Sequence, residues 1–92
     1  MSRIIRVFPE LGSSSPLWEP GSHNSNPSPE DLGLSEDLAE RLREWYQFWL
    51  DHSHWDTGFD SEKSKSQFLA MRRTIINQLR GELADSAVVV DG

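Results

Sequence analysis

Two segments of the chain place their apolar side chains on only one side of a helix, and this pattern constrains the fold most strongly. The first begins at Ser35, whose hydroxyl can cap a first turn that also holds Glu36 and Asp37. At about 100° per residue, the large apolar residues that follow form one broad face. This face holds Leu38, Leu42, Trp45 and Trp49, flanked by Tyr46 and Phe48. The pattern decays after Asp51, so we expect this helix to stop near residues 57–58.

The second segment has the same one-sided pattern. Asp60 or Ser61 can cap its start, and its apolar residues recur at the spacing of a single helical stripe. The stripe contains Phe68, Met71, Ile75, Ile76, Leu79 and Leu83. Gly81 weakens the last turn by about 1 kcal/mol relative to alanine. We therefore expect this helix to end around Ala84 or Asp85.

Short runs rich in β-branched residues lie at both ends of the chain. Residues 2–8 predict a strand that stops at the following proline, and residues 86–90 predict another. Between the first strand and the first helix, residues 12–30 are rich in Ser, Pro and Asn. This segment has too little apolar surface to offset the entropy of ordering, so we expect a flexible loop. Residues 17–19 are an exception, because Trp18 favours brief pairing beside the first strand.

The predicted order of elements is strand, long loop, helix, helix, strand. Two antiparallel helices can bury their apolar sides against one face of a small sheet. We therefore expect residues 1–92 to form a single α+β domain, with two antiparallel helices packed on a two- or three-stranded sheet. Such a sheet leaves an open edge, and pairing across that edge would give a homodimer.

Composition and motifs argue against several classes of function. The chain has no cysteine, which excludes disulfides and thiolate metal sites, and its net charge of -6 disfavours nucleic acid as a partner. No apolar run approaches the roughly 20 residues that span a membrane. Residues 1–6 lack the apolar core of an export signal, so we expect a cytoplasmic protein. Nucleophile, phosphate-loop and metalloprotease motifs are missing, which predicts a protein that is not an enzyme and uses no cofactor.

Charge is divided between the two helical segments. Residues 30–60 hold nine acidic residues and two arginines, whereas residues 61–80 hold five basic residues and one glutamate. Oppositely charged neighbouring helices can simply attract each other modestly and remain solvated. Alternatively, the acidic face docks on a basic partner surface, with exposed aromatic side chains as anchors. The candidate partner-binding residues are Glu36, Glu40, Glu44, Phe48, Trp18, Trp55 and Arg72.

Arg72 projects from the middle of the second apolar stripe. Because an unpaired buried charge is costly, its head must reach the rim or pair with an acid of the first helix such as Asp37. Alternatively, Arg72 marks a concave site for an anion or a partner. A basic strip runs along the same segment through Lys63, Lys65, Arg73 and Arg80. The strip can touch phosphate, but the surrounding negative potential opposes this.

Two histidines and two carboxylates lie close together at the end of the first helical segment. His52, His54 and Asp56 are of the types that bind zinc or nickel. Residues two apart do not share a helix face, so both histidines reach one ion only where the helix has frayed. His23 can add a ligand, but nothing in the sequence positions it. A polar helix end, with both histidines near the negative end of the dipole, is the simpler interpretation.

Several motifs occur in an arrangement that resembles a known group of proteins. They are Pro16-Leu17-Trp18-Glu19, Leu32-Gly33-Leu34-Ser35 followed by Leu38, Leu42 and Trp45, Leu79-Arg80-Gly81-Glu82-Leu83, and Val88-Val89-Val90. From Pro16 onward the chain resembles a loose group of short acidic bacterial proteins, some similar to immunity proteins that neutralise toxins by binding. The insertion at residues 21–29 departs from that arrangement. The resemblance implies a binding protein and supplies no catalytic residues.

We therefore expect a non-catalytic protein-protein interaction module, immunity-like or antitoxin-like, whose acidic helix face and exposed aromatics meet a basic partner such as a toxin. One alternative is a small metal- or anion-binding protein built around His52, His54 and Arg72. Another is a self-associating structural domain, which would form a homodimer.

Overall fold

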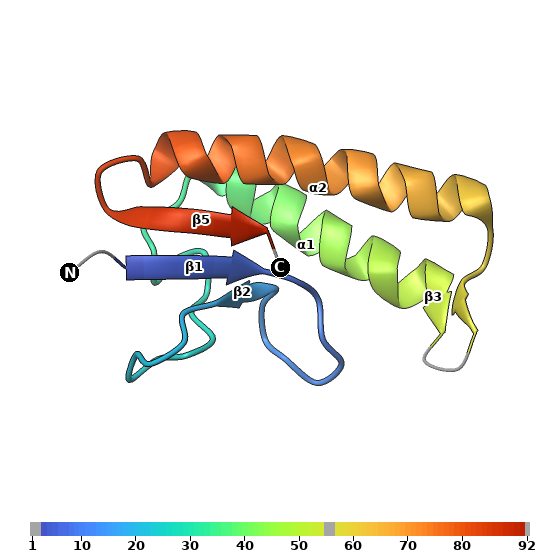
Figure 1. The fold of residues 1–92 in the computed structure, drawn as a ribbon, viewed down its shortest axis with the longest axis horizontal. Coiled ribbons are helices and arrows are strands. Elements are labelled where there is room, and N and C mark those ends of the chain that lie inside the picture. The colour runs from blue at the N-terminus through green and yellow to red at the C-terminus, as the bar shows by residue number, and fades with distance from the viewer. Residues whose placement is uncertain (1–2, 55–56, 92) are drawn as a thin grey trace.

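The computed structural model describes residues 3–54 and 57–91. It confirms the α+β fold: two helices cover one face of a three-stranded sheet, and a small hairpin connects the helices (Figure 1). The elements are β1 (Arg3–Val7), β2 (Leu17–Trp18), α1 (Glu36–His52), β3 (Ser53–His54), β4 (Gly58–Phe59), α2 (Glu62–Glu82) and β5 (Ala87–Asp91). Within the described ranges, neither helix combines the length and hydropathy that crossing a bilayer requires.

The sheet brings the two ends of the chain side by side. Its strand order is β2-β1-β5, with β1 antiparallel to β2 and parallel to β5. The register pairs Val7 with Leu17 and Ile5 with Val89. Parallel neighbours need a long crossover, which the helix pair supplies here. The predicted short strand at Leu17–Trp18 is therefore present, and it makes the sheet three-stranded.

The sheet has one buried face and one exposed face. Ile5 and Val7 point under the helices and are fully buried, whereas Ile4 and Val88 are 48% and 51% exposed. This alternation is typical of a strand that packs on only one side. The helices therefore build the core against a single face of the sheet.

Trp45 lies at the centre of the core. Its side chain is fully buried, and its ring stacks on Phe68 with 4.9 Å between centroids. The indole N–H donates to the Phe68 carbonyl at 3.2 Å, which satisfies the polar group of this large side chain. The other buried apolar residues of the core are Ile5, Val7, Leu17, Leu38, Leu42, Ile75, Ile76, Leu79, Leu83 and Val89.

Both predicted helix starts are confirmed. The Ser35 hydroxyl accepts from the backbone N–H of Leu38, and the Ser61 hydroxyl accepts from that of Ser64. Both serines have extended backbone conformations, as N-cap residues do.

The predicted end of the first helix is wrong. It stops at His52 rather than near residues 57–58, because Ser53 takes an extended conformation and pairs with Phe59 in the β3-β4 hairpin. The Ser53 N–H still donates to the Trp49 carbonyl and caps the helix end.

The second helix also ends slightly earlier than expected. It stops at Glu82, with Leu83 as its C-cap, and not at Ala84 or Asp85. Its interior includes Gly81, so this glycine does not break it. The last strand is displaced by one residue, to Ala87–Asp91.

Polar contacts hold the loop of residues 12–30 against β2. The Ser15 hydroxyl donates to the Pro27 carbonyl at 2.8 Å and accepts from the Leu17 N–H at 3.0 Å. The Asn26 side-chain amide donates to the carbonyls of Ser15 and Leu17. Apart from Leu17–Trp18 the segment forms neither helix nor strand. Its flexibility stays a prediction.

Candidate functional site

The carboxylates of Glu36, Glu40 and Glu44 form a row along the outer side of α1. They are spaced four residues apart, so they lie on one helix face, and all three are exposed. We call these three residues the acidic row. Among the described residues, none of them has a recorded ion pair within 4 Å. Like charges at this spacing repel, so the row carries a small stability cost that no ion pair in the described part of the chain offsets.

The acids beside the row are used within the protein. Asp37 accepts from Gln78 and from Arg41, each at 3.1 Å. The hydrogen bond from Gln78, helped by Arg41, lowers the pKa of Asp37. Asp37 therefore links the two helices, and its pairing distinguishes it from the acidic row.

Glu82 joins the end of α2 to the start of α1. Its carboxylate accepts from the Ser35 N–H at 2.7 Å and from the Ser35 hydroxyl at 2.6 Å. Burial opposes ionisation of Glu82, but the hydrogen bonds from Ser35 and Gln78 outweigh it and lower the pKa of this carboxyl. A negative charge here also faces the positive end of the α1 dipole.

Two surface hollows flank the outer side of α1. One, of about 140 Å³, lies between the helices and is lined by Arg41, Glu44, Met71, Thr74 and Ile75. The other, of about 350 Å³, lies between α1 and the loop and is lined by Ser14, Ser15, Pro16, Pro29, Leu42, Arg43, Tyr46, Gln47 and Leu50. Tyr46 fixes the loop side of the larger hollow, because its hydroxyl donates to the Glu10 carbonyl. The acidic row therefore has apolar recesses beside it.

The aromatic candidates do not form one patch. Phe48 is half-buried, packs against the core and lies 4.3 Å from the His52 ring. Trp18 belongs to the sheet, where its ring stacks on Phe8 at 5.0 Å and its indole N–H donates to the Phe8 carbonyl. Trp55 lies outside the described residues. Phe48 is thus the described aromatic candidate that shares α1 with the acidic row.

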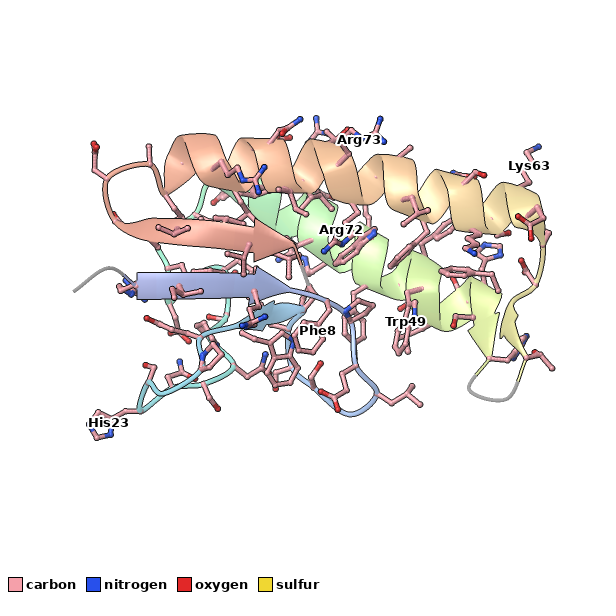
Figure 2. The ribbon with its side chains drawn as sticks, in the orientation of Figure 1. Phe8, His23, Trp49, Lys63, Arg72 and Arg73 are labelled. Carbon is pink, nitrogen blue, oxygen red and sulfur yellow. The ribbon has the colours of Figure 1, made fainter. Side chains whose placement is uncertain are left out.

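Arg72 is half-buried and points toward the end of β1 (Figure 2). It donates to the Val7 carbonyl at 3.3 Å. Asp37, suggested from the sequence as its partner, accepts from Arg41 and Gln78 instead. Arg72 reaches a strand carbonyl because α2 crosses above the sheet at this point.

The histidines do not converge with a third ligand in the described part of the chain. His52 pairs with Asp60 at 2.8 Å, and the hydrogen bonds from Ser64 and His52 lower the pKa of Asp60. His54 is exposed on β3, and Asp56 lies outside the described residues. Figure 2 places His23 on the loop, at the opposite end of the molecule from the hairpin. Within residues 3–54 and 57–91, no group of three or more His, Asp or Glu side chains is arranged to hold a metal ion.

The larger hollow and the polar link at Glu82 were not predicted from the sequence. The position of Tyr46 on the flank of the apolar face is the signal that this flank meets another part of the chain. That it meets residues 10–16 depends on the path of the loop, which has no helical or strand periodicity to reveal it. Glu82 belongs to the Leu79-Arg80-Gly81-Glu82-Leu83 motif, but its partner Ser35 lies 47 residues away in the sequence.

Comparisons with known proteins identify a family. A family model described as Serratia CdiI immunity protein-like matches residues 3–90. No curated protein matches the chain, and no solved structure does. The match extends over all five strands and both helices except the last residue of β5. The chain therefore belongs to the Serratia CdiI immunity protein-like family.

Proposed function

We propose that this protein is an immunity protein, which binds a toxin protein and blocks its action without catalysing a reaction. The family match over residues 3–90 carries this proposal. The expected cytoplasmic location and the absence of catalysis are parts of the same proposal. We assign the contact to the acidic row of α1.

The charge of the acidic row supports this assignment. Asp37 and Glu82 are held by partners within the protein, whereas Glu36, Glu40 and Glu44 are exposed with no recorded ion pair among the described residues. Their negative potential attracts a basic surface and speeds association more than it strengthens the final complex. The proposed partner is therefore a toxin with a basic surface.

The hollow at Tyr46 and Leu50 supports an anchor beside the charged contact. Leu50 is 39% exposed at its edge, and Leu42 and Tyr46 line it from α1. Interfaces draw most of their affinity from a few side chains that fill such recesses, with charges around them. An apolar or aromatic side chain of the toxin fits this place, with basic residues over Glu40 and Glu44.

A charge-reversal experiment tests the proposal. The toxin is sought as the product of a neighbouring gene, and its capture by this protein is measured with purified components. The double variant Glu40→Lys/Glu44→Lys should weaken capture at least tenfold, mainly through slower association, and the loss should shrink at high salt. The same variant should fail to protect cells that express the toxin.

A matched control changes the net charge equally at another place. Glu62→Lys/Asp85→Lys reverses two exposed acids that lie outside α1 and do not line the hollow at Tyr46, and neither side chain forms an ion pair within the described residues. The Glu40→Lys/Glu44→Lys variant should keep the unfolding temperature of the parent protein, and the control should lower it only slightly, because Glu62 lies in the first turn of α2. Equal loss of capture in the control would reject the acidic row as the contact. Failure of any toxin to bind the parent protein would reject the immunity function itself.

A further inference from the structure

The flank of α2 that faces away from α1 holds a third hollow. A hollow of about 250 Å³ is lined there by Leu69, Arg72, Arg73, Ile76, Asn77 and Arg80. We call these six residues the arginine flank. Gln78, on another face of α2, bonds to Asp37 of α1, and no residue of α1 lines this hollow. The arginine flank and the acidic row therefore belong to different sides of the helix pair.

The arginine flank concentrates positive charge in an acidic protein. Residues 63–81 contain three arginines and two lysines and no acidic residue, although the whole chain has a net charge of -6. Within the described ranges, Arg73 and Arg80 have no carboxylate within ion-pairing distance. An anionic group brought to this hollow would meet the guanidinium groups of Arg73 and Arg80 without first displacing an acid of the described residues.

The edge of the sheet holds Arg80 in place. Its Nε and Nη2 atoms donate to the Val89 carbonyl on β5 at 3.4 and 3.3 Å. A guanidinium has five N–H donors, so this contact leaves others available on the same rigid group. Fixing the side chain in advance reduces the entropy lost when it binds a carboxylate. The same contact covers a carbonyl at the open edge of the sheet, which opposes pairing by another strand there.

Apolar surface accompanies the charge. Leu69 is 49% exposed at one end of the hollow, and Ile76, which is almost fully buried, lies between the arginines along the helix. A site for a free phosphate needs donors and no apolar neighbours, whereas a protein segment offers both carboxylates and apolar side chains. The negative charge of the rest of the protein also repels nucleic acid.

We propose that the arginine flank is a second binding site, which takes an acidic segment of a protein partner. Carboxylates of the segment bind the guanidinium groups of Arg73 and Arg80, and an adjacent apolar side chain packs on Leu69. This goes beyond the proposed toxin contact, because that contact uses negative charge on α1. The two sites are therefore complementary to opposite charges and can be occupied independently.

The test uses the isotope-labelled full chain and a synthetic peptide of glutamate, aspartate and leucine. Addition of the peptide should shift the backbone amide signals of residues 69–80 and of β5 in a saturable way, and less at high salt. The variant Arg73→Gln/Arg80→Gln should bind at least tenfold more weakly. Lys63→Gln/Lys65→Gln removes the same charge from exposed positions that do not line the hollow, and it should bind within twofold of the parent protein.

Several outcomes would overturn the proposal. Equal shifts with a peptide whose acids are replaced by their amides would show that charge is not recognised. Equal or larger shifts with inorganic phosphate or a single-stranded oligonucleotide would assign the site to another anion. Equal loss of peptide binding in the lysine control would show that only the net charge of the protein matters.

Arg80→Gln could also disturb β5, because Arg80 bonds to the Val89 carbonyl. In that case the single variant Arg73→Gln, which leaves the Val89 contact intact, decides whether the arginine flank binds the peptide. Glu40→Lys/Glu44→Lys should leave peptide binding unchanged, so this result is separate from the toxin contact.

Discussion

The half of the helix pair that lies over the sheet is packed with aliphatic side chains, whereas the half that extends beyond the sheet is packed with aromatic ones. Leu38, Leu42 and Leu79 in the covered half are fully inaccessible to solvent. In the extending half, Phe48, Trp49 and Phe59 are partly buried against the core, and the Phe59 ring lies against Phe68 next to the β3-β4 hairpin. Figure 1 shows this half projecting past the ends of β1 and β5, and Figure 2 shows Trp49 within it.

The difference follows from the lengths of the elements. The 21 residues of α2 extend for about 32 Å at 1.5 Å per residue. The five residues of β1 extend for only about 17 Å. Where the sheet provides no second layer, large flat rings fill the space between the helices and the hairpin. This explains why Phe48, Trp49, Phe59 and Phe68 gather at this end of the helix pair.

The largest predicted effect is in the covered half. Leu79→Ala removes a fully buried side chain between α2 and the sheet and leaves a cavity there. The free energy of unfolding should fall by about 3 kcal/mol, within the usual range for such substitutions. Urea unfolding followed by tryptophan fluorescence measures this loss. A loss below about 1 kcal/mol would mean that this half is not tightly packed.

A smaller effect is expected in the extending half. Phe59→Ala removes a half-buried ring that lies 5.0 Å from Phe68. Because the ring is already partly in water, the unfolding free energy should fall by about 1 to 2 kcal/mol. Hydrogen exchange should increase at residues 46–52 and 62–70 and stay unchanged in β1 and β5. Uniform faster exchange throughout the chain would contradict the division into two halves.

Much of the fold was predictable because its signals are local. The positions of Ser35 and Ser61 just before an apolar helical pattern predict the two helix starts, and both serines cap their helices in the structure. The end of α1 was not predictable, because residues 53–59 turn back in a hairpin that depends on pairing between Ser53 and Phe59. The parallel pairing of β1 with β5 likewise depends on contacts between opposite ends of the chain.

For the candidate site, the sequence gives the charges but not their partners. The positions of Glu36, Glu40 and Glu44 on one face follow from helical spacing alone. That Asp37 and Glu82 are used internally, while the acidic row is not, depends on how α2 lies beside α1. The same applies to Arg72, whose strand carbonyl partner is 65 residues away.

The sheet and the hairpin also differ in the carboxylates that lie beside them. Glu19, beside β1, accepts two hydrogen bonds from Arg3, at 2.7 and 2.9 Å, and its side chain is only 12% exposed. Asp60, at the hairpin, pairs with His52 in a more exposed place. The hydrogen bond from Arg3 lowers the pKa of Glu19, and that from Ser64 lowers the pKa of Asp60.

A lowered pKa in the folded protein makes stability depend on pH. The contribution of Glu19 is present above the unfolded pKa of about 4.5 and is lost as the pH falls through the folded value. Glu19→Gln should therefore lower the melting temperature at neutral pH and reduce its fall on acidification. Asp60→Asn should act in the same direction but less. Thermal unfolding at a series of pH values measures both. A larger effect of Asp60→Asn would contradict the prediction that the less exposed carboxylate at the sheet contributes more to stability than the one at the hairpin.

The smallest predicted effect has the opposite sign. Glu40 is repelled by Glu36 and Glu44, one turn away on each side, and Arg43, three residues further on, lies 3.9 Å from Glu30. Glu40→Gln keeps the shape of the side chain and removes both repulsions, so the protein should become more stable by about 0.3 kcal/mol at low salt. The gain should disappear at high salt, and Glu10→Gln should show none. Capture of the toxin should nevertheless weaken, because the charge that destabilises α1 is the charge that the basic partner meets. If Glu40→Gln is more stable but captures the toxin more weakly, the charge of the acidic row serves binding. If capture is unchanged, the acidic row is solvated surface with no role in toxin binding.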